Sequence, residues 1–147
     1  PWVVKTHWPK YVEGCARAGR EAKGEDWRVA KSIFVAEDDA TVRRMTRDPG
    51  NPFAYYFRNL LRKGQALRGT TFFKHDPSLP DSAVTDEYLT SQLIIAGTPN
   101  EVADRLRAFR EYIGPFGRLL YVGHDWADAR AMRRSMELMA EKVLPQL

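Results

Sequence analysis

The sequence has little cysteine: Cys15 is the only one, so no intrachain disulfide can form. A lone cysteine is typical of proteins from a reducing compartment, and we therefore expect a cytoplasmic location. Cys15 lies on the apolar side of a predicted helix with no evident base beside it, which favours packing in the core over nucleophilic catalysis. The sequence also lacks any apolar run near the roughly 20 residues that a membrane span needs. No membrane partner is expected.

Long runs of one charge are absent as well. Lys and Arg outnumber Asp and Glu by 23 to 19, a formal net charge of +4, but the basic residues are spread along the chain. The densest group, Arg130, Arg133 and Arg134, is more typical of a solvated helix face than of a nucleic-acid interface. We therefore expect no nucleic-acid partner, and no set of residues predicts a metal site.

What the sequence does have is enough apolar residues for a hydrophobic core. Its 147 residues are 44% hydrophobic, which predicts a single domain over residues 1–147. Apolar spacings of four and three predict a helix over residues 6–19. A continuously apolar strand follows over residues 28–36, and Asp38 or Asp39 can cap the helix after it.

The middle of the chain, residues 48–86, is broken by proline and glycine. We expect an irregular insertion there, with a helix formed by "FAYYFRNLLRKGQAL". Such an insertion is either a lid over a substrate or a packing element, and the residues leave both open. Its aromatic side chains would suit an apolar ligand or a core equally: Phe53, Tyr55, Tyr56, Phe57, Phe72 and Phe73.

Regular alternation returns in the last third of the chain. A short strand at 92–96 leads into Thr98, which starts a T-x-x-E capping box with Glu101, and the helix ends at Gly114. A strand at 118–122 and a closing helix complete the pattern. Apolar spacing in that closing helix predicts that one face packs in the core: Met132, Met136, Met139 and Val143.

Three strand–helix units with buried strands predict a parallel sheet with right-handed crossovers. Ligands of such folds bind beyond the carboxyl ends of the strands. Gly97 and Thr98 follow one strand and Gly123 follows another, so we expect these residues at one rim and treat them as candidates for binding a substrate or cofactor.

The residues after Gly123 carry the candidate chemistry. His124 can move protons near neutral pH, Asp125 can orient it, and Trp126 offers a flat apolar surface. We therefore take His124 and Asp125 as candidate catalytic residues and Trp126 as a candidate binding residue. The alternative is structural: Asp125 or Asp128 caps the last helix while the other two side chains pack nearby.

Three segments together resemble the C-terminal part of the bacterial luciferase-like flavin-dependent monooxygenases. They are "HWPKYVEGCARAGREAKGEDWRVAKSIFVAEDDA", "YLTSQLIIAGTPNEVADRLRAF" and "GPFGRLLYVGHDWADARAMRRSMELMAEKVLPQL". The resemblance implies an α/β fold, the C-terminal portion of a (β/α)8 TIM-type barrel with an insertion at 48–86. A whole barrel needs about 250 residues, so we expect about three parallel strands and an incomplete barrel within this chain.

The resemblance also implies an activity. Reduced FMN, supplied by a separate flavin reductase, would react with oxygen, and one oxygen atom would pass to a small organic, terpene-like substrate in a dry pocket. Arg118, Arg130 and Arg134 are loose candidates for holding phosphate. The start at Pro1 predicts a missing N-terminal half that supplies much of the flavin pocket, so this chain alone would be inactive.

Two alternatives stay open. The chain could be a non-catalytic half-barrel or degenerate relative that acts through association with another chain, since exposed strand edges favour pairing. It could also be a deazaflavin-dependent oxidoreductase of the same fold. A homo-oligomer, or contact with the missing half, is expected in either case.

Overall fold

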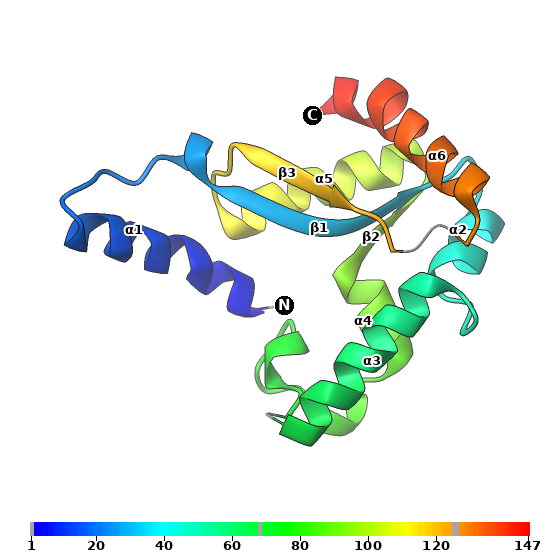
Figure 1. The fold of residues 1–147 in the computed structure, drawn as a ribbon, viewed down its shortest axis with the longest axis horizontal. Coiled ribbons are helices and arrows are strands. Elements are labelled where there is room, and N and C mark those ends of the chain that lie inside the picture. Colours follow the sequence, from blue (N-terminus) through cyan, green and yellow to red (C-terminus); the bar gives the residue numbers. More distant parts are fainter. Residues whose placement is uncertain (1, 68, 125–126) are drawn as a thin grey trace.

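The computed structural model describes residues 2–67, 69–124 and 127–147 (Figure 1). Three strands and six α-helices make up its regular structure, joined by short 3-10 turns. The strands are β1 (Arg28–Val35), β2 (Ile94–Gly97) and β3 (Arg118–Val122). The helices are α1 (His7–Arg17), α2 (Asp39–Thr46), α3 (Pro52–Leu67), α4 (Asp86–Leu93), α5 (Pro99–Ile113) and α6 (Ala129–Leu138).

The three strands form one parallel sheet in the order β2-β1-β3. β2 pairs with the carboxyl half of β1, from Ser32 opposite Ile94 to Val35 opposite Gly97. β3 pairs with the amino half on the other side and ends with Val122 opposite Ser32. The prediction of three parallel strands without a closed barrel is confirmed for the described residues.

The strand order carries a further finding. In a (β/α)8 barrel each strand pairs with the next strand along the chain. Here β3 pairs with β1 instead of β2, so the crossover through α5 passes over the central strand. The four-residue β2 reaches only half of β1. β3 pairs along the other edge of the long central strand.

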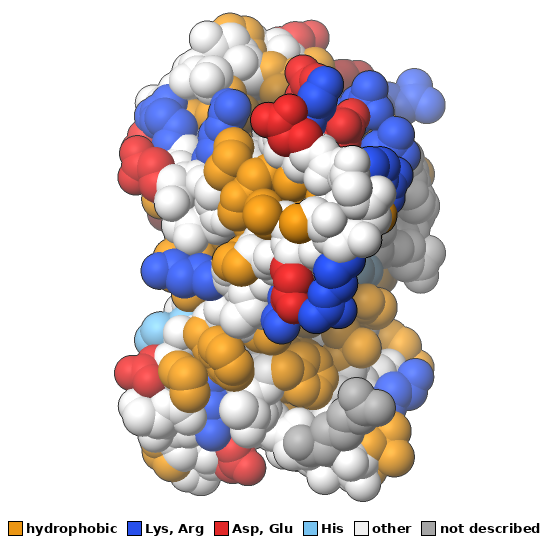
Figure 2. Space-filling model, turned by 90° about the vertical axis from the view of Figure 1, so that its left-hand side faces the viewer, with side chains coloured by type: hydrophobic (Ala, Val, Ile, Leu, Met, Phe, Trp, Pro, Cys, Tyr) orange, Lys and Arg blue, Asp and Glu red, His pale blue; other side chains and the backbone are white. Residues whose placement is uncertain are grey.

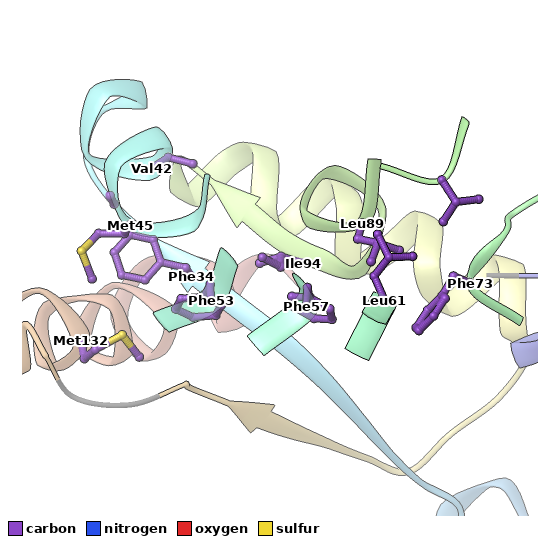
Figure 3. Packing of buried hydrophobic residues seen from close by; sticks show 12 residues of the cluster. Phe34, Val42, Met45, Phe53, Phe57, Leu61, Phe73, Leu89, Ile94 and Met132 are labelled. Carbon is purple, nitrogen blue, oxygen red and sulfur yellow. The ribbon is translucent and has the colours of Figure 1, made fainter. Parts of the chain in front are cut away.

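Two hydrophobic clusters cover the two faces of the sheet. Ile33 and Val35 point toward α5 and α6, where Val102, Leu106 and Leu138 bury them. Phe34, from the opposite face of β1, points toward α2 and α3. Figure 3 shows this second cluster, which brings together residues far apart in the sequence: Phe34, Val42, Met45, Phe53, Phe57, Leu61, Phe73, Leu89, Ile94 and Met132.

The insertion at 48–86 is more regular than its composition predicts. α3 runs for 16 residues, and its buried aromatic rings Phe53 and Phe57 pack on the sheet. Tyr55 is 62% exposed on the other side of the same helix, and Tyr56, at the edge of the packed face, is 43% exposed. The insertion is therefore a packing element on one face, and it leaves these two aromatic rings accessible to solvent.

Local signals in the sequence place most helix ends. Asp38 caps α2 by accepting the Thr41 backbone N–H at 2.8 Å, and the Glu101 carboxylate accepts the backbone N–H of Thr98 at 2.7 Å. α5 ends at Gly114, whose φ of 101° favours glycine. The strand expected at 92–96 begins later, at Ile94, and ends at Gly97, because α4 continues through residue 93.

The closing helix departs from its predicted face at one position. Met132, Met139 and Val143 are buried as expected, whereas Met136 is 47% exposed. The helix winds into a π-helical turn over Met139–Val143, which shifts the face that meets the sheet. Cys15 is buried at the end of α1, as predicted.

The surface mixes both signs of charge. On the face seen in Figure 2, Lys and Arg side chains lie among Asp and Glu side chains, with groups of hydrophobic side chains between them. Over the residues that the structure describes, no helix combines the length and the apolar character that crossing a membrane requires.

Candidate functional site

His124 lies two residues beyond the carboxyl end of β3, on the face of the sheet that α3 covers. Its Nε2 is 2.7 Å from the Oγ of Ser32, which projects from the same face of β1. The pairing of Val122 with Ser32 brings these two residues together across 92 positions of sequence. Strand register therefore fixes the position of the imidazole.

Aromatic rings of α3 surround the imidazole on several sides. Tyr56 stacks on it, with ring centroids 4.2 Å apart and an angle of 28° between the planes. Phe53 and Phe57 meet it edge to face at 4.9 and 5.6 Å. These contacts come from one helix because residues 53, 56 and 57 share a face.

This environment determines the protonation of His124. Burial among apolar rings lowers its pKa below the ordinary value of 6.5, because the charged imidazolium loses hydration there. His124 is therefore a neutral imidazole at pH 7. With Nε2 bonded to Ser32, its Nδ1 is the ring nitrogen left for a ligand or a proton.

A hollow of about 930 Å³ opens beside this ring. Such a volume suits a ligand of cofactor size. Gly123 and His124 line it from the end of β3, and α3 supplies most of the opposite wall. Its lining combines apolar and aromatic side chains with a few polar ones: Pro49, Pro52, Tyr55, Tyr56, Asn59, Leu60, Lys63 and Ala127.

The structure does not bring Gly97 and Thr98 to this hollow. β2 ends opposite Val35, three residues further along β1 than the end of β3, a stagger of about 10 Å. Gly97 lines a separate hollow of about 410 Å³ with α2 and α5. The Thr98 hydroxyl donates to the Glu101 carboxylate at 2.8 Å and belongs to the cap of α5. The expected common rim is thus divided in two.

Asp125 and Trp126 lie outside the described residues, so their roles stay predictions. The sequence predicted that Asp125 or Asp128 caps the last helix. Asp128 does so: its carboxylate accepts the Ala131 backbone N–H at 2.9 Å and caps α6. The cap of the last helix therefore does not require Asp125.

The arginines named from the sequence are not gathered at the hollow. Arg118 begins β3, at the opposite end of the strand from His124. Arg134 is engaged by Glu37 at 2.7 Å and Glu137 at 3.3 Å. A phosphate near His124 would instead meet Lys63, which lines the hollow.

Sequence reasoning did not single out Ser32 or Tyr56, which both contact His124. Ser32 sits within an apolar strand, and a polar residue at a buried strand position is itself a signal. Tyr56 was named only as one aromatic residue among several. Its stacking on His124 depends on how α3 docks, which no local pattern encodes.

Comparisons with known proteins agree on one family, although no family model matches the chain. The chain is 35% identical over 143 residues to 4-hydroxyprotoasukamycin monooxygenase of Streptomyces nodosus subsp. asukaensis, covering 97% of this chain and 36% of that protein. It is 26% identical over 150 residues to 3,6-diketocamphane 1,6-monooxygenase of Pseudomonas putida, covering 99% and 38%.

A solved structure gives the same result for the fold. The oxygenating constituent of 3,6-diketocamphane monooxygenase from Pseudomonas putida, a type II Baeyer–Villiger monooxygenase in complex with FMN, matches with a TM-score of 0.82 and 24% identity. The match covers 98% of this chain and 40% of that one, so this chain spans well under half the length of its relatives. By sequence and fold together, the chain is similar to the C-terminal part of these flavin-dependent monooxygenases, which are of the luciferase-like family.

Proposed function

We propose that this chain forms part of a monooxygenase that uses reduced FMN and oxygen to oxygenate a small organic, terpene-like substrate. The observation that carries the proposal is the placement of His124 between the aromatic rings of α3, facing a hollow of about 930 Å³ beyond the end of β3. The named relatives act as monooxygenases, which supports the reaction class.

The residues at the hollow fit one side of a flavin site. Tyr56 and His124 present flat rings that would face the isoalloxazine or the substrate, and Lys63 would meet the phosphate. Pro49, Pro52 and Leu60 supply apolar surface. The hollow thus offers flat rings, a cation and a neutral imidazole, which are groups that suit the isoalloxazine and the phosphate of FMN.

The proposed mechanism assigns distinct tasks to the residues of this chain. Reduced FMN, when bound, supplies the electrons for activating oxygen. The rings of α3 exclude water from the reacting groups, which limits loss of the electrons to hydrogen peroxide. Ser32 orients His124 through Nε2, and His124, neutral at pH 7, accepts or donates a proton at Nδ1.

The test uses the protein purified as its reading frame encodes it. A flavin reductase with NADH supplies reduced FMN, and bicyclic ketones and limonene serve as substrates. We expect oxygenated product that depends on FMN. The proposal also includes a separate flavin reductase as partner and a cytoplasmic location. Product with reduced deazaflavin and none with FMN would favour the deazaflavin alternative. Absence of product and of flavin-dependent oxygen uptake would overturn the proposal.

One observation favours a second candidate, association through the open sheet. Leu120 of β3 is 47% exposed although it lies in a strand, and β3 forms one edge of the sheet. An exposed apolar strand at an edge favours pairing with another chain. A concentration-dependent dimer by analytical ultracentrifugation, together with no flavin-dependent chemistry, would support this role in place of catalysis.

A further inference from the structure

A further hollow, of about 390 Å³, is lined by Lys31, which lies on the opposite face of β1 from the Ser32 that contacts His124. Lys31 projects into it from β1, whereas its neighbour Ser32 points to the other face. Arg105, Phe109 and Tyr112 form one wall because they share a stripe of α5. The first 3-10 turn, Trp2–Thr6, contributes Val4 on the opposite side.

The Lys and Arg side chains that line this hollow have no acidic counterpart in its described lining. Lys31 and Arg105 line it, and Lys5 lies nearby with its Nζ 4.2 Å from the centroid of the Tyr112 ring. Among the residues that the structure describes as lining it, none is acidic. The carbonyl oxygens of Ser91, Ile94 and Ala96 hold the Arg105 guanidinium at 2.9 to 3.0 Å.

Lys31 lies in an environment that disfavours its charge. Its Nζ lies 5.1 Å from the centroid of the Phe109 ring. Burial and the nearby Arg105 charge lower the Lys31 pKa to about 8. A buried cation near a second cation is stabilised by an anion, because the anion restores the attraction that water no longer supplies.

His75 and Gln92 complete the polar part of the lining. The Tyr88 hydroxyl accepts the backbone N–H of His75 at 2.8 Å and lies 2.8 Å from its Nδ1. The side chains of His75 and Gln92 line the hollow, and the Gln92 amide offers N–H donors there.

We propose that this hollow binds a small organic anion with a flat apolar body, such as an aromatic carboxylate, with its charge at Lys31 and its ring against Phe109 and Tyr112. This site is separate from the monooxygenase function proposed for the His124 hollow. Its occupant would brace the contact between the first turn of the chain and α5.

Benzoate and its neutral analogue benzamide test the proposal, with binding followed by two-dimensional amide NMR at pH 7. We expect benzoate to shift the signals of residues lining the hollow with a Kd of about 1 mM, and benzamide to bind at least about fivefold more weakly. Lys31→Met should weaken benzoate binding by at least about fivefold. The matched control Lys23→Met removes an exposed lysine and should change nothing.

The pH dependence provides an independent readout. Above pH 8, benzoate affinity should fall by up to about tenfold per pH unit as Lys31 loses its proton, while Arg105 keeps its charge. Lys31→Met should remove this dependence, and Lys31→Arg should extend binding to higher pH. Equal binding of benzoate and benzamide, equal binding by folded Lys31→Met, or no binding at 20 mM benzoate, a concentration about twentyfold above the expected Kd, would overturn the proposal.

Discussion

His124 combines a half-buried ring, a hydrogen bond to Ser32 and a stacked tyrosine. Its Nε2 is bonded to Ser32 and its face is covered by Tyr56, so among the described contacts Nδ1 is the nitrogen that can serve chemistry. A neutral imidazole held in this way can pass a proton without carrying a permanent charge into a dry site. Two measurements separate this role from simple packing.

The first concerns coupling in the proposed enzyme. His124→Ala should lower the product formed per reduced flavin by at least about tenfold, with the lost electrons appearing as hydrogen peroxide, because proton transfer and exclusion of water both fail. Flavin affinity should change by less than about threefold. The control His7→Ala removes an exposed histidine and should keep normal coupling. Unchanged coupling with reduced stability would make His124 structural.

The second concerns stability against pH. The pKa of His124 is lower in the folded chain than in the unfolded chain, so below about pH 6.5 the unfolded state takes up a proton that the folded state does not. The stability contributed by neutral His124 is therefore lost as pH falls toward and through its folded pKa. Urea unfolding at pH 7 and pH 5 should show a smaller loss for His124→Gln than for the wild type. An equal loss in both proteins would contradict the burial of this ring.

At the scale of elements, the start of β3 depends on a close backbone approach. A Cβ added at Gly117 would overlap the backbone carbonyl of Glu25, in the 3-10 turn before β1. The Gly117 N–H also donates to the Trp27 carbonyl at 3.1 Å. The first strand and the last strand are thus joined at their amino ends by backbone contact.

Gly117→Ala should destabilise the fold by about 2 kcal/mol or more, because a backbone cannot move aside as a flexible side chain can. Gly14→Ala is the matched control: Gly14 lies within α1, and a Cβ there meets nothing within 4 Å. Removing a glycine from a helix should stabilise by about 0.5 to 1 kcal/mol. Urea unfolding measures both, and equal effects would show that the contact with Glu25 is unimportant.

At the scale of the whole molecule, the chain supplies only part of a barrel. Ligand sites of barrels are assembled from the loops that follow several strands, and this chain contributes three strands. Its match covers 36% to 40% of the relatives' length. Over the described residues, the hollow beside His124 is lined by the end of β3, by α3 and by a few residues before α3 and α6.

The isolated 147-residue chain should therefore bind FMN weakly, with a Kd at least about tenfold above that of 3,6-diketocamphane 1,6-monooxygenase measured beside it. Quenching of flavin fluorescence reports both affinities under the same conditions. A tight one-to-one complex with the isolated chain, seen by calorimetry, would show instead that these three strands suffice for the site.

The sequence by itself determined the local features. The capping box of Thr98 and Glu101, the stop at Gly114 and the three buried strands all depend on residues a few positions apart, so their signals lie within a short window. The candidate histidine at the end of a parallel strand also followed from the alternation of elements. The roles of Asp125 and Trp126 stay predictions.

Only the tertiary structure decided which of these features meet. It placed β1 between β2 and β3, set Ser32 against His124, docked Tyr56 on the imidazole, and moved Gly97 to a different hollow. The contact between Ser32 and His124 spans 92 residues and depends on strand register and helix docking. Those arise from burying two faces of a sheet at once, and no stretch of sequence contains that information alone.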